Sequence, residues 1–496
     1  MACRSACRLP PDVIATTSFC VWRGFGRKHP PGPILGTEQA APVVRCSRMP
    51  FRPARSYVTV PSTNQLNAFW LPFTPNSEFK RRPRIVTGAD GMHYTDQTGR
   101  RILDSAAGLW CSNAGHCRPP IVKAIQQAAA TLDFAPSFQF AHPKAFEAAA
   151  KIAALAPGSL NHVFFANSGS EAADTAIKIA VAWHRARGEG SRTRIIGRER
   201  AYHGVGMAGI SAGGIGNNRK WFNSLAFPAD HLPATYDRER QAFTNGQPQW
   251  GAHFADELEK LVALHDASTI AAVIVEPMAG STGVLPPPVG YLEKLRAITA
   301  RHGILLIFDE VITGFGRLGA AFAAERLRVV PDIITFAKGV TSGTVPMGGV
   351  IVDQRIYDQF MVAPDHAIDL FHGYTYSGHP LAAAAACATI DLYRDEGLFQ
   401  RAAELEEYFA AAAHSLKGVA HVIDIRNMGL AAAIELAPIE GAPGKRGFEA
   451  MRTMFFEESV MIRIAGDCVA FSPPLIAEKS HIDEMFGKLA AVLKRG

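Results

Sequence analysis

Two residues that could act on an amine each follow a short apolar stretch of the chain. Lys338 ends the segment 331–338 and precedes a glycine, and Asp309 ends the segment 303–309. The pattern predicts two buried strands whose polar ends meet at one edge of a sheet. Lysine can form a Schiff base with the aldehyde of pyridoxal 5′-phosphate, and a carboxylate can keep the pyridine nitrogen protonated. Singly, a lysine at a strand end and an aspartate capping a helix are commoner, so the neighbouring residues must decide.

A phosphate-binding turn is expected upstream, where a strand gives way to a helix. Ser168, Gly169 and Ser170 lie in the segment 167–172, after an apolar run and before a helical pattern. Hydroxyl groups and free backbone N–H groups at a helix N-terminus bind phosphate. An ordinary N-cap followed by a capping glutamate explains the same residues equally well.

Further residues could complete a site around a pyridine ring. Tyr202 and His203 lie on a Gly-flanked loop after a predicted strand, where an aromatic ring could stack on the cofactor. Val311, two residues after Asp309, could cover the opposite face, although a single valine is more often a core residue. Glu276 ends another buried strand before a proline and could order the residues beside the ring, or could be a solvated acid.

The order of these features resembles a known family. The segments 306–319 and 336–339 are similar to the signature of the class III, or omega, aminotransferases of pyridoxal-phosphate fold type I. The resemblance covers residues 67–496, and four segments resemble the beta-alanine:pyruvate aminotransferases most: 69–75, 108–111, 113–118 and 276–283. It implies an α/β fold with a large domain around a mainly parallel sheet and a smaller α+β domain.

The resemblance also implies roles for residues that carry no signal of their own. Thr375 would reach the cofactor phosphate of a neighbouring subunit, which makes a homodimer with shared active sites, or a tetramer, the expected assembly. Arg463 would pair with a substrate carboxylate and swing aside for other substrates, although Ile464 replaces the small or polar residue usual after it, and a surface salt bridge is the alternative. Four residues would line the substrate pocket: Leu71, Trp110, Tyr202 and Ser281.

The implied activity is a ping-pong transfer of an amino group from an omega-amino acid, such as beta-alanine, to pyruvate. Lys338 and Asp309 would be the catalytic residues. An aminomutase or a decarboxylase on the same scaffold is the alternative, and a non-catalytic regulator is a more distant one. The expected partners are a small amino donor and a keto acid, without nucleic acid, membrane or metal.

The distribution of charge along the chain argues against a nucleic-acid-binding protein. Residues 1–60 hold nine Lys or Arg and two acids, so their formal charge is +7. The whole chain has a formal net charge of +6, which leaves 6 − 7 = −1 for the residues after 60. A nearly neutral body lacks the basic surface that nucleic acids require. The basic extension predicts a disordered arm, a targeting segment or a start upstream of Met49, in a cytoplasmic protein for which mitochondrial import stays open.

The alternation of strands and helices predicts the domain organisation. A disordered extension is expected over 1–60, followed by an N-terminal part over 61–100 that packs with the small domain. The large cofactor-binding domain is expected over 101–374, where apolar strands alternate with helices. Ala-rich helices and short strands over 375–496 predict the small C-terminal α+β domain.

Overall fold

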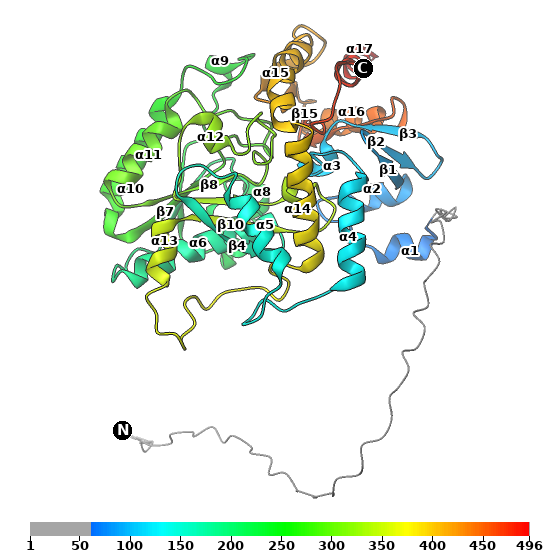
Figure 1. The fold of residues 1–496 in the computed structure, drawn as a ribbon. Coiled ribbons are helices and arrows are strands. Elements are labelled where there is room, and N and C mark those ends of the chain that lie inside the picture. Colours follow the sequence, from blue (N-terminus) through cyan, green and yellow to red (C-terminus); the bar gives the residue numbers. More distant parts are fainter. Residues whose placement is uncertain (1–60, 496) are drawn as a thin grey trace, which may run out of the picture. The chain divides into compact units, whose positions relative to one another are not determined.

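The computed structural model describes residues 61–495, and the predictions made for the N-terminal extension fall outside this range. Three β-sheets organise the described part of the chain (Figure 1). None of the helices within 61–495 is both long and apolar enough to cross a membrane.

The largest sheet has seven strands in the order β4-β10-β9-β8-β7-β5-β6. Six strands run parallel, and only β10 runs antiparallel to both of its neighbours. A mainly parallel sheet in an α/β fold was predicted, and it is confirmed. The strands span Leu160–Ala166 (β4), Gly348–Asp353 (β10), Ile333–Phe336 (β9), Leu305–Asp309 (β8), Ile270–Val275 (β7), Arg194–Arg198 (β5) and Ala229–Leu232 (β6).

Helices cover both faces of this sheet, which explains why its strands lack polar alternation. Along β8, Leu305 and Ile307 pack into one apolar cluster while Leu306 and Phe308 pack into another, because successive side chains of a strand point to opposite faces. The first cluster includes helices α6 (Gly169–Ala186), α7 (Met207–Ala212) and α13 (Gln354–Phe360). The second includes α10 (Glu257–His265), α11 (Tyr291–Arg301) and α14 (Pro380–Asp395).

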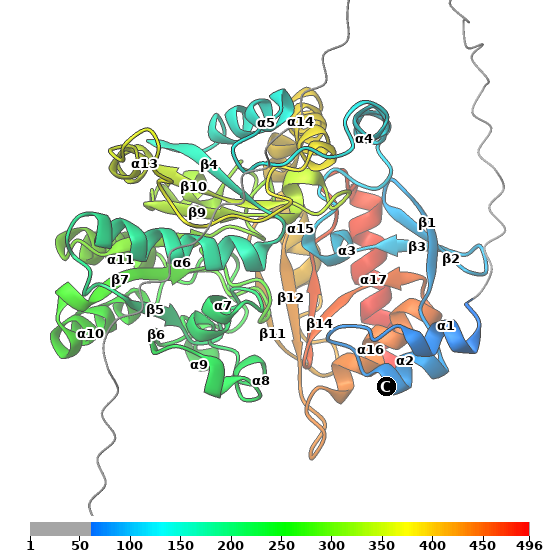
Figure 2. The ribbon, with the colours of Figure 1, turned by 90° about the horizontal axis from the view of Figure 1, so that it is seen from below.

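Two four-stranded sheets lie beside the large one (Figure 2). The first joins β1 (Val86–Asp90), β2 (His93–Asp96) and β3 (Arg101–Asp104) to β13 (Val460–Met461), which runs parallel to β3. The second consists of β11 (Val422–Asn427), β12 (Ala432–Leu436), β15 (Cys468–Phe471) and β14 (Arg463–Ala465). Segments from both ends of the described chain therefore share one sheet. The domain boundaries given above stay a prediction.

Helix α14 links these parts and supports the turn that carries Lys338. It packs against α4 (Pro119–Thr131), α5 (Pro143–Ala153) and the short 3-10 helix Lys338–Thr341. Near its C-terminus, the buried Tyr393 hydroxyl donates to the carbonyl oxygen of Gly339 at 2.6 Å. Helix α14 thus fixes the backbone that follows Lys338. Three C-terminal helices lie by the small sheets: α15 (Leu398–His414) contacts β11 and β12, α16 (Lys445–Phe456) contacts β13, β14 and β15, and α17 (Lys479–Arg495) packs against α15 and α16.

Candidate active site

Asp309 and Lys338 follow neighbouring parallel strands, so they lie at the same edge of the large sheet. Asp309 is the last residue of β8 and is paired in register with Thr335 of β9, three residues before Lys338. The Thr335 hydroxyl donates to Asp309 Oδ1 at 3.1 Å. Lys338 itself has a φ of 48°, a conformation that costs energy for a residue with a side chain and that is concentrated at functional sites.

The Asp309 carboxylate is held by three donors. Besides Thr335, the backbone N–H of Val311 donates to Oδ1 at 3.2 Å, and His203 Nδ1 lies 2.8 Å from Oδ2. His203 is buried, and its Nε2 has no hydrogen-bond partner among residues 61–495. Both oxygens of the Asp309 carboxylate are therefore oriented by protein groups, while the second ring nitrogen of His203 stays available to a bound molecule.

Glu276, just beyond β7, forms the next layer of the site. Its carboxylate accepts from the backbone N–H of Tyr202 at 2.9 Å and of Gly280 at 3.3 Å. Burial raises the pKa of Glu276, the His203 ring opposes this shift, and the nearby Asp309 carboxylate raises the pKa further. Glu276 thus holds the loop that carries Tyr202 and His203 against the end of the sheet.

The Lys338 amine lies among these acids. Its pKa is lowered from the ordinary lysine value, mainly by burial, while Cys111, Asp309 and Glu276 act in the opposite direction. The guanidinium group of Arg463 lowers it further. A larger fraction of this amine is consequently neutral than of a solvent-exposed lysine, as a nucleophile or a general base requires.

The N-terminus of α6 offers an anion-binding position. Ser168 is the N-cap, and its hydroxyl accepts from the backbone N–H of Glu171 at 3.2 Å. The Glu171 side chain in turn accepts from the N–H of Asn167 at 2.7 Å, so the capping alternative is present as well. Within 61–495 no acceptor is found for the backbone N–H groups of Gly169 and Ser170. The two interpretations are compatible, because capping consumes only some of the free N–H groups.

Gly169 also lets the α6 terminus approach Val311 closely. A Cβ added at this glycine would lie 2.8 Å from Val311 Cγ1 and 3.0 Å from Cγ2, closer than side chains pack. The Ser170 hydroxyl accepts from the N–H of Val205 at 3.1 Å, which ties the Tyr202 loop to the same helix. The phosphate-type turn, the Asp309 strand end and the aromatic loop therefore converge.

Four of the five residues predicted to bind substrate also belong to this region. Burial and then the Asp309 carboxylate raise the pKa of Tyr202, whereas Arg463 on β14 lowers it, which places the arginine close to the ring. Trp110 is buried in an apolar cluster with Met278, Val284 and other residues near the 280–284 turn. Ser281 is a partly exposed residue of that turn.

Leu71 and Thr375 lie apart from this group. Leu71 lies in the segment before α2 (Asn76–Arg81). Its backbone N–H donates a hydrogen bond to Asn76 Oδ1, and its carbonyl oxygen accepts one from Asn76 Nδ2, both at 2.9 Å. Thr375 is exposed. No hydrogen bond among the described residues connects either of them to the Lys338 region, so their assigned roles would need a second subunit or a substrate.

Two arginines that shape the site gave no signal in the sequence. Arg200 Nη2 donates to the carbonyl oxygen of Thr282 at 3.0 Å, and Arg426 Nε donates to that of Gly283 at 2.9 Å. Arg200 lies in the turn after β5 and Arg426 lies on β11, so two separate segments fix the turn that carries Ser281. Neither lies in a recognisable motif, and only the packing of β11 against this turn brings Arg426 there.

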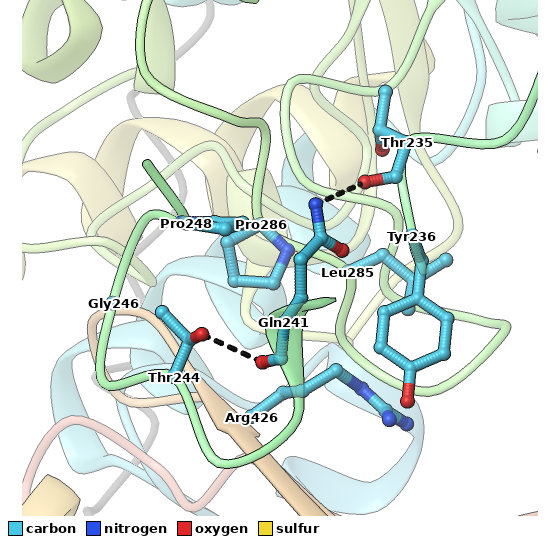
Figure 3. A pocket seen from close by; sticks show the side chains of 9 residues that line it. All are labelled: Thr235, Tyr236, Gln241, Thr244, Gly246, Pro248, Leu285, Pro286 and Arg426. Carbon is cyan, nitrogen blue, oxygen red and sulfur yellow. Dashed lines mark hydrogen bonds between the residues drawn. The ribbon is translucent and has the colours of Figure 1, made fainter. Parts of the chain in front are cut away.

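A small cavity next to this turn is not a substrate site. It is lined by nine residues, among them Tyr236, Gln241 and Arg426, and Figure 3 shows the arginine side chain passing beside the tyrosine ring. Its free volume is about 10 Å³, room for roughly one water molecule. Pockets that bind small molecules are tens of times larger. Within 61–495 no group of three or more His, Cys, Asp or Glu could hold a metal ion.

The arrangement fits pyridoxal 5′-phosphate in three independent respects. Lys338 supplies an amine for the aldehyde, and Asp309 supplies a carboxylate, oriented from behind by His203, for the pyridine nitrogen. The free N–H groups at the start of α6 supply a place for the phosphate. Each feature faces the same strand ends, so one molecule could engage all of them.

Comparison with known proteins gives a consistent picture. A model of the family described as aminotransferase class-III matches residues 76–493. The chain is 58% identical over 430 residues to an omega-aminotransferase of Caulobacter vibrioides, covering 87% of this chain and 98% of that protein. It is 50% identical over 441 residues to a beta-alanine–pyruvate aminotransferase of Pseudomonas aeruginosa, covering 88% and 98%.

Solved structures confirm the fold. An (S)-enantioselective omega-transaminase from Thermomicrobium roseum matches with a TM-score of 0.81 at 34% identity, covering 87% of this chain and 97% of that one. An omega transaminase from Pseudomonas jessenii, solved in complex with PMP, matches with a TM-score of 0.81 at 31% identity, with the same coverage of the two chains. The predicted fold type I is thereby confirmed.

Proposed function

We propose that this chain, which belongs to the class III aminotransferases and depends on pyridoxal 5′-phosphate, transfers the amino group of an omega-amino acid such as beta-alanine to pyruvate. The observation that carries this proposal is the convergence of Lys338, Asp309 and the α6 N-terminus at one sheet edge. The names of relatives support the substrate pair: beta-alanine–pyruvate in Pseudomonas aeruginosa and omega-amino acid–pyruvate in Pseudomonas putida.

The residues that would hold the cofactor follow from the geometry. The N–H groups of Gly169 and Ser170, with the Ser168 hydroxyl, would hold its phosphate, and Tyr202 and Val311 would lie on the two faces of its ring. When bound, the cofactor supplies an electron sink for charge that develops on the substrate carbon.

The protein's own groups then divide the remaining work. The Asp309 carboxylate, fixed by His203 and Thr335, would keep the proton on the ring nitrogen. Lys338 Nζ, whose lowered pKa favours the neutral amine, would accept the proton from the substrate carbon as a general base and later return it. Arg463, exposed on β14 and close to Tyr202, would bind the carboxylate of beta-alanine or pyruvate.

The experiment that tests this function follows product formation. With beta-alanine and pyruvate, the wild-type protein should form alanine, and Lys338→Ala should lose steady-state turnover together with the yellow absorbance of the bound cofactor. Lys260→Ala is the matched control, because that lysine is exposed on α10 and pairs with Glu257 only. Release of carbon dioxide without alanine would instead indicate the decarboxylase alternative, and isomerised donor without alanine the aminomutase.

We also propose that the enzyme is a homodimer in which Thr375 approaches the partner's phosphate site. Large apolar side chains are exposed on segments close to Thr375: Phe134 packs edge-on to Tyr376 with ring centroids 6.0 Å apart, and Phe371 is 87% exposed. An apolar patch of this kind favours a protein interface. The other exposed aromatics of these segments and of the N-terminal part are Phe69, Trp70, Phe73, Phe138, Phe140 and Phe146.

Solution mass tests the assembly. Phe371→Asp should shift the protein from dimer to monomer in light scattering. It should also weaken cofactor retention, because Thr375 would no longer reach the phosphate site of the partner subunit. Leu264→Asp, at an exposed position of α10, should leave the mass unchanged. A wild-type protein that is monomeric at micromolar concentration contradicts this part of the proposal. The cytoplasmic location stays a prediction.

A further inference from the structure

The loop after β3 forms a wall of the Lys338 site. It contains Trp110, which shares an apolar cluster with Met278 and Ile312, the residue that follows Val311. The residues that follow Trp110 pack against the turn that carries Lys338: a Cβ added at Gly339 would lie 2.8 Å from Asn113 Nδ2, and one added at Gly343 would lie 3.0 Å from Cys111 Cβ. This wall therefore limits the space in which a donor side chain can lie.

The loop has an unusual backbone. Ala107, Gly108 and Trp110 have φ values of 45°, 66° and 62° within four residues. Left-handed conformations are unfavourable for alanine and tryptophan, so a loop of this shape persists only when its surroundings hold it. Backbone strain of this kind is concentrated where the position of a side chain matters for function.

One buried carboxylate holds the loop. Asp104, at the end of β3, is inaccessible to solvent and accepts from the backbone N–H of Ala106 at 3.0 Å and of Gly108 at 2.6 Å. Its Oδ2 also accepts a hydrogen bond from His116 Nε2 at 2.7 Å. The His116 ring packs on Tyr94 with centroids 4.3 Å apart, which fixes its direction. Hydrogen bonds to an ionised carboxylate are stronger than neutral ones, and three of them converge here.

The same segment is connected to β13, the strand that ends two residues before Arg463. Ser105 follows Asp104, and both its N–H and its hydroxyl donate to the carbonyl oxygen of Met461, at 3.1 and 2.6 Å. Met461 lies two residues before Arg463. The short segment 104–105 is thus hydrogen-bonded both to the loop that carries Trp110 and to Met461, from which the chain continues to Arg463.

We propose that Asp104 and His116 are positioning residues that set the place of Trp110 and thereby the selection of small amino donors. Neither residue lines the site itself; they act through the loop. This inference rests on the proposed aminotransferase function. When the pair is weakened, the loop relaxes toward unstrained backbone, the wall moves, and small donors lose contact with it while bulkier amines gain room.

The test compares donors of two sizes with pyruvate as the acceptor. Asp104→Asn, whose amide cannot accept from all three donors, should raise the KM for beta-alanine about tenfold or more while kcat changes less. The ratio of kcat/KM for a bulky arylalkylamine to that for beta-alanine should rise. Since Asp104→Asn could fail to fold, His116→Phe is the second variant: it keeps a ring on Tyr94 but cannot donate, and the same change should follow with smaller size.

A rescue separates positioning from general damage. Ala107→Gly removes the steric cost of the left-handed backbone, so in the Asp104→Asn background it should restore part of the KM for beta-alanine. Failure of this rescue would overturn the role assigned to backbone strain. The matched control is Asp332→Asn, a buried acid at the opposite end of β9 that accepts from Leu306 N–H and Arg296. It should lower the melting temperature and leave KM unchanged.

The outcomes also distinguish this inference from the proposed function. If wild-type protein forms no alanine from pyruvate with any amine, the proposed function is wrong. If wild type is active and retains yellow cofactor, but Asp104→Asn and His116→Phe leave both KM and donor ratio as in wild type, the positioning role is wrong. Equal KM changes in Asp332→Asn would contradict it too.

Discussion

The contact between Gly169 and Val311 allows a quantitative test of where the cofactor lies. In Gly169→Ala the new Cβ would meet Val311 Cγ1 at 2.8 Å, which is 3.4 − 2.8 = 0.6 Å short of ordinary contact. Without cofactor, Val311 can move into the open site, because it is only partly buried. With cofactor bound, the displaced side chain meets the ring. The cost of the substitution should therefore fall on binding rather than on folding.

The size of the effect follows from overpacking. Extra methyl groups in well-packed surroundings cost about 1–3 kcal/mol, which corresponds to an affinity loss of about 5- to 150-fold. Titration of the cofactor-free protein with pyridoxal 5′-phosphate, followed by absorbance, measures the dissociation constant directly. The melting temperature of the cofactor-free variant should stay close to that of wild type, since alanine is favourable in a helix.

Gly190→Ala is the matched control, because this glycine is exposed and a Cβ there would meet nothing within 4 Å. It should leave affinity and melting temperature unchanged. An unchanged dissociation constant in Gly169→Ala, with a lowered melting temperature of the cofactor-free protein, would refute the reasoning: Val311 would then pack into the protein interior and not against the cofactor.

Three further predictions concern charges. Asp309→Asn should lower kcat by about 10²–10³-fold, because an amide does not stabilise a ring cation, and a fully active variant would contradict the role of this acid. Arg463→Ala should reduce kcat/KM for pyruvate by about 10- to 100-fold and spare a carboxylate-free amine, so equal losses in the two half-reactions would contradict a carboxylate-binding role. Burial raises the pKa of Glu310 to about 7 in the folded protein, against an ordinary value of 4.5. The folded state then holds this proton more tightly than the unfolded state, so stability is lost as the pH rises from about 4.5 to about 7. Thermal unfolding of Glu310→Gln should therefore depend less on pH over this interval, and identical pH profiles would show that Glu310 is already ionised.

Local patterns predicted several elements of the fold well. The fully apolar run 270–275 and the helical pattern 291–301, which stops shortly before Gly303, are local signals, and the structure forms the strand Ile270–Val275 and the helix Tyr291–Arg301 over the same residues. The direction of Gly348–Asp353 was not predictable in this way. A buried strand has the same composition whether it runs parallel or antiparallel, and only its neighbours in the sheet decide.

The sequence by itself determined the chemistry this protein carries, because each chemical group is marked by a local pattern. These patterns are a lysine and an acid after apolar runs, a helix-capping turn, and an aromatic residue flanked by glycine. Tertiary structure alone decided which groups support them. Arg426 contacts the 280–284 turn, and Asp104 contacts His116 and the strained Trp110 loop. No local sequence pattern predicts either contact. Side-chain periodicity reports which face a residue occupies, whereas contacts between distant segments depend on how whole elements pack.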